Sequence, residues 1–124
     1  DPLAELRPVL HAQEVLAMNH AVSRVRVAPA LRRYVVGLAT ATREERDVFL
    51  GASPRAGIAL VRAAKALALL RGRDFVVPKD IKDLAVRVLA HRLVLSPDAK
   101  VRGQGAEDVV NRLLETVPVP QSGS

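Results

Sequence analysis

The sequence contains no cysteine among its 124 residues and only three aromatic side chains, Tyr34, Phe49 and Phe75. Without cysteine, a disulfide scaffold and a thiolate zinc site are both excluded. No apolar run approaches the roughly 18 residues that a membrane-spanning helix needs. The start, Asp1-Pro2-Leu3, has no initiating methionine and no basic stretch typical of a signal peptide. We therefore expect one cytoplasmic domain over residues 1–118, cut from a longer polypeptide.

Positive charge is in excess, with 19 basic and 13 acidic residues and a formal net charge of +6. Such an excess suggests an acidic partner, for example nucleic acid, a phosphate or an anionic surface. The basic residues are scattered, however, and alternate with acids at 43–47 and 79–83. Aromatic side chains that could stack on bases are also scarce. The composition favours a solvated surface, and a small basic helical nucleic-acid-binding module is the alternative.

Apolar residues recur at helical spacing in five segments, which predicts an all-α bundle of five helices. The expected helices cover about residues 12–24, 29–43, 54–70, 78–95 and 106–117. Between them, the β-branched segments 25–27 and 75–77 predict two short extended links, which can form one small β-bridge. We expect residues 1–10 to be irregular, 43–50 to form a loop or short helical turn, 96–105 to form a loop, and 119–124 to be a disordered tail.

The third helix is the most apolar of the five. Between Ala56 and Leu70 only Arg62 and Lys65 interrupt it, which predicts a helix buried on most sides at the centre of the bundle. Gly72 follows its end and suits a left-handed C-terminal cap.

Motifs for catalysis and metal binding are missing. None of the four lysines follows a glycine, so the sequence has no phosphate-binding loop, and no pair of histidines has the spacing of a zinc protease. The stretch from Gly51 to Arg55 is similar to a hydrolase nucleophile elbow, but it lacks the closing glycine. Pro54 also removes a backbone N–H that an oxyanion hole would use. We expect no metal site and no catalytic residue.

Arg55 is the strongest candidate for a binding residue. Ser53 suits the N-cap of the third helix and Pro54 its first position, so Arg55 lies in the first turn. A helix N-terminus favours anions, and a guanidinium can clamp a phosphate through two hydrogen bonds. An exposed arginine with no ligand fits the same position, and the residues alone leave both interpretations open.

Several stretches together resemble the C-terminal lid of MoxR-type AAA+ ATPases. They are Gly51-Ala52-Ser53-Pro54-Arg55-Ala56, residues 63–68, residues 72–81 and residues 88–93, with Asp1-Pro2-Leu3 and Thr116-Val117-Pro118 matching the two ends of that lid. One departure is Val77, where the family often has threonine or serine as the N-cap. The absence of a capping hydroxyl should weaken the helix start by about 1 kcal/mol.

The resemblance implies a function for the parent protein and a role for Arg55. Arg55 would be the sensor-2 arginine that faces the phosphates of ATP, and Ser53 and Pro54 would form the turn that presents it. The parent would be a hexameric ring chaperone driven by ATP hydrolysis, with its phosphate-binding loop and magnesium site in a core outside this chain. Alone, the chain would be no enzyme and would not bind ATP stably. Its expected partners are that core, neighbouring subunits and a client with a von Willebrand factor A domain, and no role is assigned to Arg73 or to residues 91–93.

Overall fold

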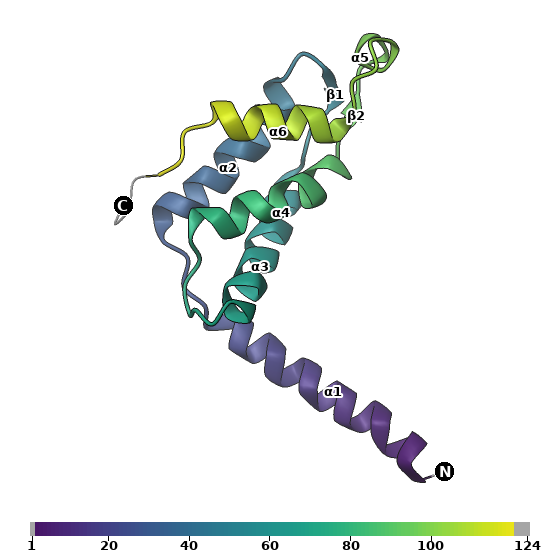
Figure 1. Ribbon diagram of the computed structural model, residues 1–124, viewed down its shortest axis with the longest axis vertical. Helices are drawn as coiled ribbons and strands as arrows, with labels where there is room; N and C mark the ends of the chain where they lie inside the picture. Colours follow the sequence, from purple (N-terminus) through teal and green to yellow (C-terminus); the bar gives the residue numbers. More distant parts are fainter. Residues whose placement is uncertain (1, 121–124) are drawn as a thin grey trace.

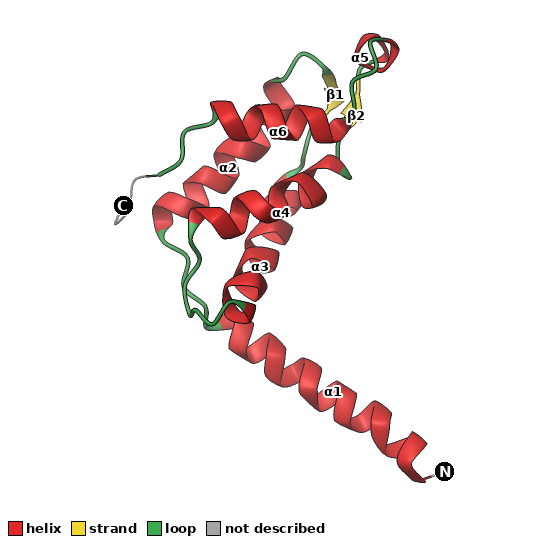
Figure 2. Ribbon diagram, in the orientation of Figure 1, coloured by secondary structure: helices red, strands yellow, loops and turns green. Residues whose placement is uncertain are grey.

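The computed structural model describes residues 2–120, with side chains from Ala12 onward. Over these residues the chain forms six helices and one two-stranded antiparallel sheet (Figure 1, Figure 2). In order, the elements are α1 (Pro2–Ser23), α2 (Pro29–Glu44), β1 (Val48–Leu50), α3 (Pro54–Leu70), α4 (Pro78–Ala90), β2 (Val94–Leu95), α5 (Pro97–Val101) and α6 (Ala106–Thr116). The expected all-α bundle is confirmed, with one short helix more than predicted.

Four helices form the body of the fold in two layers. α2 and α3 pack against each other, and α4 and α6 pack across them, α4 mainly on α3 and α6 on both α4 and α2. α1 contacts α3 at one end of the bundle and then projects away from it (Figure 1). Two packed layers are sufficient to enclose one apolar core.

The main core lies between these layers. α3 contributes a stripe of mostly small residues at a spacing of four, Ala56, Leu60, Ala64 and Ala68, each at most 1% exposed. Small residues in such a stripe allow the neighbouring helix to approach closely. The prediction that this helix is buried on most sides is wrong, because its neighbours cover only part of its circumference. Ile58 is 58% exposed and Leu70 is 79% exposed.

A smaller apolar cluster lies beside the sheet, and the sequence did not predict it. Its buried members are Val48, Leu95, Ala99, Val109 and Leu113. β1 and β2 pair in antiparallel register, with Val48 opposite Leu95 and Leu50 opposite Val94. The expected loop at 43–50 therefore contains a strand, and the fourth helix ends at Ala90 instead of residue 95. Pairing between distant segments overrides the local helical spacing here.

The two extended links expected at 25–27 and 75–77 are confirmed, and they pair with each other. Arg26 and Phe75 form an isolated parallel β-bridge. The Arg26 N–H donates to the Asp74 carbonyl at 2.8 Å, and the Val76 N–H donates to the Arg26 carbonyl at 2.9 Å. The bridge joins the start of α2 to the start of α4.

The structure describes all or part of three segments that the sequence predicts to be irregular. The predicted irregular start is wrong, because α1 begins at Pro2, where the missing N–H of proline costs nothing. The predicted loop at 96–105 contains the one-turn helix α5, which Ser96 caps by accepting from the Ala99 N–H at 3.1 Å. In the predicted tail, Val119 is half-buried against the main core, and residues 121–124 lie outside the described residues.

Gly72 ends α3 as predicted. Its φ of +79° is the left-handed conformation that favours glycine. The Arg73 N–H donates to the Ala68 carbonyl at 2.9 Å and the Gly72 N–H to the Leu69 carbonyl at 3.0 Å. These two bonds form a Schellman motif, which turns the chain sharply toward α4.

Candidate functional site

The turn between β1 and α3 determines where α3 begins. The Ala52 N–H donates to Thr42 Oγ1 at 2.9 Å, and the Ala52 carbonyl accepts from Arg43 Nη1 at 3.1 Å. Thr42 is fully buried, and its hydroxyl donates to the Ala39 carbonyl at 2.6 Å. A Cβ on Gly51 would lie 2.7 Å from the Arg43 Cα, so the close approach of the turn to α2 requires glycine. The last turn of α2 therefore holds this loop through both polar groups of Ala52.

Ser53, Pro54 and Arg55 follow at the positions that the sequence predicted. Ser53 is the N-cap residue in an extended conformation, with φ −76° and ψ 167°, and Pro54 is the first helical residue. The Ser53 hydroxyl makes no capping hydrogen bond, so its expected capping role reduces to its backbone conformation. Its carbonyl accepts from the Ala56 N–H at 2.9 Å.

The Arg55 side chain is exposed in the first turn of α3. It forms no hydrogen bond or ion pair with any side chain described in the structure, and the first turn contains no acidic residue. A guanidinium and the positive end of the helix dipole thus coincide at one exposed point. This combination suits a phosphate or another small oxyanion.

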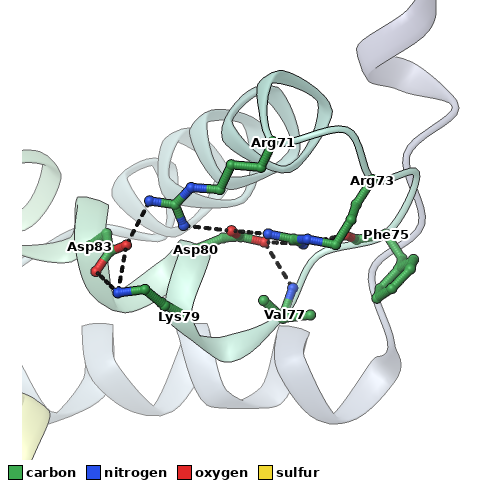
Figure 3. Close-up of polar contacts among 7 residues, drawn as sticks. All are labelled: Arg71, Arg73, Phe75, Val77, Lys79, Asp80 and Asp83. Carbon is green, nitrogen blue, oxygen red and sulfur yellow. Dashed lines mark hydrogen bonds and ion pairs between the residues drawn. The ribbon is translucent and has the colours of Figure 1, made fainter.

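Arg73 has a different role, because it is bound to the buried carboxylate of Asp80 (Figure 3). Its two terminal nitrogens donate to Asp80 Oδ2 at 2.8 Å and Oδ1 at 2.7 Å, and Nη1 also donates to the Phe75 carbonyl at 2.9 Å. Arg71 Nη1 donates to Oδ1 at 3.0 Å, and the Val77 N–H donates to Oδ2 at 2.9 Å. Arg73 therefore joins the end of α3 to the start of α4 and has no terminal nitrogen directed to a ligand.

Hydrogen bonding determines the ionisation of this cluster. Burial opposes ionisation of Asp80, but the hydrogen bonds from Arg73, the Val77 N–H and Arg71 outweigh it and hold the pKa of Asp80 below its ordinary value. The bond to Asp80 also satisfies the Val77 N–H at the start of α4. A threonine or serine side chain at position 77 would not bond this N–H, because an N-cap side chain accepts from the second or third helical N–H.

A second ion-pair cluster fixes the sheet end of the molecule. Asp47, 7% exposed, accepts from Arg102 Nη2 at 2.5 Å and from Arg112 Nη2 at 3.1 Å. The same Arg112 nitrogen donates to Glu45 Oε1 at 3.0 Å. Hydrogen bonding from Arg102 is the main cause of the lowered pKa of Asp47. The cluster ties α5 and α6 to the segment between α2 and β1, and its charges are mutually satisfied.

The remaining residues singled out in the sequence lie at the end of α4. His91 is exposed at the C-cap, and Arg92 Nη1 donates to the Val88 carbonyl at 2.9 Å. Leu93 is half-buried and packs against both apolar clusters. Among the described residues, no three histidine, aspartate or glutamate side chains lie close enough together to hold a metal ion. Nor does any helix in this part of the chain have the length and apolar character to cross a membrane.

Comparison with known proteins identifies the fold. Residues 40–113 match the family described as the AAA lid domain. The chain belongs to the AAA lid domain family. Thr42, Gly51 and Arg55 all lie within the matched residues of this lid domain.

Relatives extend the likeness to nearly the whole lid domain. Chaperone MoxR1 of Mycobacterium tuberculosis is 42% identical over 91% of this chain, and protein MoxR of Methylorubrum extorquens is 40% identical over 84%. YeaC of Bacillus subtilis, whose function is uncharacterised, is 40% identical over 96%. The chain spans 31%, 34% and 37% of these three proteins respectively, about a third of their length.

A solved structure supports the same family. A protein from Cytophaga hutchinsonii, provisionally described as an ATPase, superposes on 88% of this chain with a TM-score of 0.83 and 31% identity. The chain corresponds to 36% of that structure. The resemblance to the lid of MoxR-type AAA+ ATPases that the motifs suggested is therefore confirmed.

The sequence singles out Arg55 as a candidate but does not indicate the residues that hold its turn. Thr42 and Arg43 show no local pattern that would indicate this role, because both bond to the Ala52 backbone, nine or ten residues away. Gly51 is the one local indication that this turn packs closely on another element, because a glycine shortly before a helix start often marks a close backbone approach. Its contact with α2 depends on the tertiary structure and could not be identified from spacing.

Proposed function

We propose that the chain is the nucleotide-sensing lid of a MoxR-type AAA+ ATPase and that Arg55 is its sensor-2 arginine. The observation that carries this proposal is the exposed Arg55 guanidinium at the N-terminus of α3, on a turn that Thr42 and Arg43 hold in place. A positioned cation can stabilise phosphate charge without reorganising during the reaction.

The contacts of the other arginines are consistent with this role for Arg55. Arg71, Arg73, Arg102 and Arg112 are engaged in internal ion pairs, whereas Arg55 has no such partner among the described residues. ATP would supply the phosphoanhydride bond, and magnesium would bind in the core of the parent. Arg55 would bind the phosphates from the lid side. The lid by itself would catalyse nothing.

The proposal extends to the parent protein. We infer a cytoplasmic ring, hexameric as in the family, in which the lid packs on the core of its own chain and on neighbouring subunits. ATP turnover would drive the remodelling of a client with a von Willebrand factor A domain. The names of the MoxR relatives, one of them a chaperone, support this inference.

Substitution of Arg55 in the full-length parent tests the role of this residue. We expect Arg55→Ala to lower the ATP turnover number about 100-fold, the loss typical of removing one positioned electrostatic donor. The unfolding midpoint of the lid should not change, because the side chain is exposed and forms no hydrogen bond or ion pair with a described side chain. Arg87→Ala is the matched control, since Arg87 is an exposed arginine on α4 without a described ion pair.

Two results would contradict the proposal. One is equal ATP turnover in the Arg55→Ala and Arg87→Ala parents. The other is ATP hydrolysis by the purified 124-residue chain, because a lid without its core should be inactive.

The nucleic-acid-binding alternative has less support. Five arginines form ion pairs within the described residues, namely Arg26, Arg71, Arg73, Arg102 and Arg112. These pairs reduce the positive charge that is free to bind a phosphate backbone. A gel-shift titration over a salt series separates the two functions, because backbone binding weakens steeply with salt through counterion release.

A further inference from the structure

No other helix that the structure describes covers one face of the α2–α3 layer. α4 and α6 cover the other face, and α1 contacts α3 only at one end of the bundle. The uncovered face forms an open groove of about 500 Å³, which we call the α2–α3 groove. Its floor is apolar and includes Val35, Val36, Ile58 and Val61. Val36 is 62% exposed and Ile58 is 58% exposed, so two large apolar side chains face water at its centre.

The rim of the groove is positively charged. Arg32 and Arg43 come from α2, and Arg62 and Lys65 come from α3, so both helices contribute cations, and none of the described residues that line the groove is acidic. Arg43 is engaged with the Ala52 carbonyl, but Arg32, Arg62 and Lys65 form no ion pair with any residue that the structure describes.

An apolar floor combined with cations from both helices defines the chemistry of its occupant. An amphipathic helix can place an apolar stripe on the floor and acidic residues beside these cations. A polyanion such as nucleic acid would leave Val36 and Ile58 in contact with water and so does not match the floor. An entirely apolar helix would leave the three unpaired cations without counter-charges.

No described helix of this chain has the required combination. The exposed side of α1 is apolar at Val15, Leu16 and Met18, but Glu14 is the one acidic side chain between residues 12 and 23. α6 is acidic at its start, but its apolar face is buried in the bundle. A second copy of the described residues therefore offers no helix of this kind.

We propose that the α2–α3 groove binds an amphipathic helix with acidic flanks, contributed by the part of the parent polypeptide that lies outside this chain. Charge complementarity defines the type of helix. The source follows from length, since relatives are about three times as long as the region they share with this chain. The inference rests on the proposed function only in that the chain is one part of such a longer protein.

Thiol accessibility tests the source of the occupant. Because this chain has no cysteine, Ile58→Cys introduces a single thiol on the groove floor, in a parent whose other cysteines have been replaced. We expect its modification to be about tenfold slower in the monomeric parent than in the 124-residue chain, as for other sites that react only after local opening. Val101→Cys, at a position 87% exposed on α5, reports any general slowing. Equal rates for the Ile58→Cys thiol in parent and chain would overturn the proposal.

A designed peptide tests the chemistry of the occupant. The probe is a synthetic helical peptide as long as α3, with leucine along one stripe and glutamate elsewhere, and its matched control has lysine in place of glutamate. An environment-sensitive fluorophore on the Ile58→Cys thiol should shift to the blue with the glutamate peptide and remain unchanged with the lysine peptide. In the Arg62→Glu/Lys65→Glu chain this preference should invert, with about tenfold weaker binding of the glutamate peptide.

Three outcomes would contradict the proposed chemistry. They are equal binding of the two peptides, equal binding of polyglutamate that has no apolar stripe, and a blue shift that grows with protein concentration without peptide. The last would assign the groove to a second copy. These measurements involve no nucleotide, so their failure is distinguishable from failure of the Arg55 assay.

Discussion

Asp80 is the most deeply buried charged residue in the described fold. It is fully buried, and it accepts four hydrogen bonds from Arg71, Arg73 and the Val77 N–H. A buried carboxylate is tolerated only when its charge and its lone pairs are both satisfied. The Gly72 turn brings the two arginines to it, so one acidic residue fixes the geometry between α3 and α4.

We expect Asp80→Asn to lower the free energy of unfolding by about 3 kcal/mol, because two guanidinium groups would face a neutral amide in a buried site. Urea unfolding followed by circular dichroism measures this change. Asp83→Asn is the matched control on the same helix, since Asp83 is partly exposed and contacts Arg71 and Lys79 at the surface. Losses of similar size in the two variants would show that the buried Asp80 contributes no more to stability than the partly exposed Asp83.

The lowered pKa values predict the acid sensitivity of the fold. The pKa values of Asp47, Asp80 and Asp83 all lie below the ordinary value of 3.8. A depressed pKa in the folded state stabilises the protein above the unfolded pKa, and this stabilisation is lost as the pH falls through the folded pKa. We expect the free energy of unfolding to decrease from about pH 5 to pH 2. In urea titrations over this pH range, Asp80→Asn should make the decrease in the free energy of unfolding shallower. An unchanged pH dependence would contradict the lowered pKa of Asp80.

At the scale of elements, the junction of α2, β1 and α3 positions the candidate site. The buried Thr42 and the Arg43 side chain bond to opposite sides of Ala52, and Gly51 crosses α2 with no room for a side chain. The direction of Arg55 therefore depends on contacts made at the end of a different helix.

We expect Gly51→Ala to destabilise the chain by about 1–3 kcal/mol, the usual cost of forcing extra atoms into a packed contact. The turn would also shift away from α2, so the parent should lose ATP turnover as well. Gly37→Ala is the control. A Cβ at this mid-helix position would meet only Val117 at 3.8 Å, so alanine should stabilise α2 by about 0.5–1 kcal/mol. Thermal unfolding of both variants checks the pair, and stabilisation by Gly51→Ala would contradict the predicted clash.

The elements that the sequence predicted are those with a long, one-sided apolar pattern. α2, the start of α4 and α6 were predicted within a residue or two, and the start of α3 was predicted from Ser53 and Pro54. β1 and β2 were missed because strands of three and two residues depend on pairing between residues 48 and 95. α5 was missed because five residues are too few to show a period. The apolar pattern on all sides of α3 could not show which faces the chain itself covers.

At the scale of the whole molecule, α1 is distinct from the bundle. The side chains of residues 12–20 are all exposed, although the apolar spacing of this segment predicted its helix correctly. Burial in α1 begins only near Ala21 and Val22, where its last turn meets the end of α3. The core clusters include Val25 and later residues but none from 12–24. Folding of the bundle should therefore be independent of the exposed side chains of residues 12–20.

We expect removal of residues 1–19 to change the free energy of unfolding by less than about 1 kcal/mol, because the side chains described in this segment, those of residues 12–19, are all exposed. Leu60→Ala is the contrasting variant, since Leu60 is fully buried at the centre of α3 and its truncation should cost about 2–5 kcal/mol. Urea unfolding of the shortened chain and of Leu60→Ala in the full chain measures both. Loss of cooperative unfolding in the shortened chain would show that α1 belongs to the folding unit. Retention of a single sharp transition would define residues 20–120 as the domain, with α1 as a connection toward the rest of the parent.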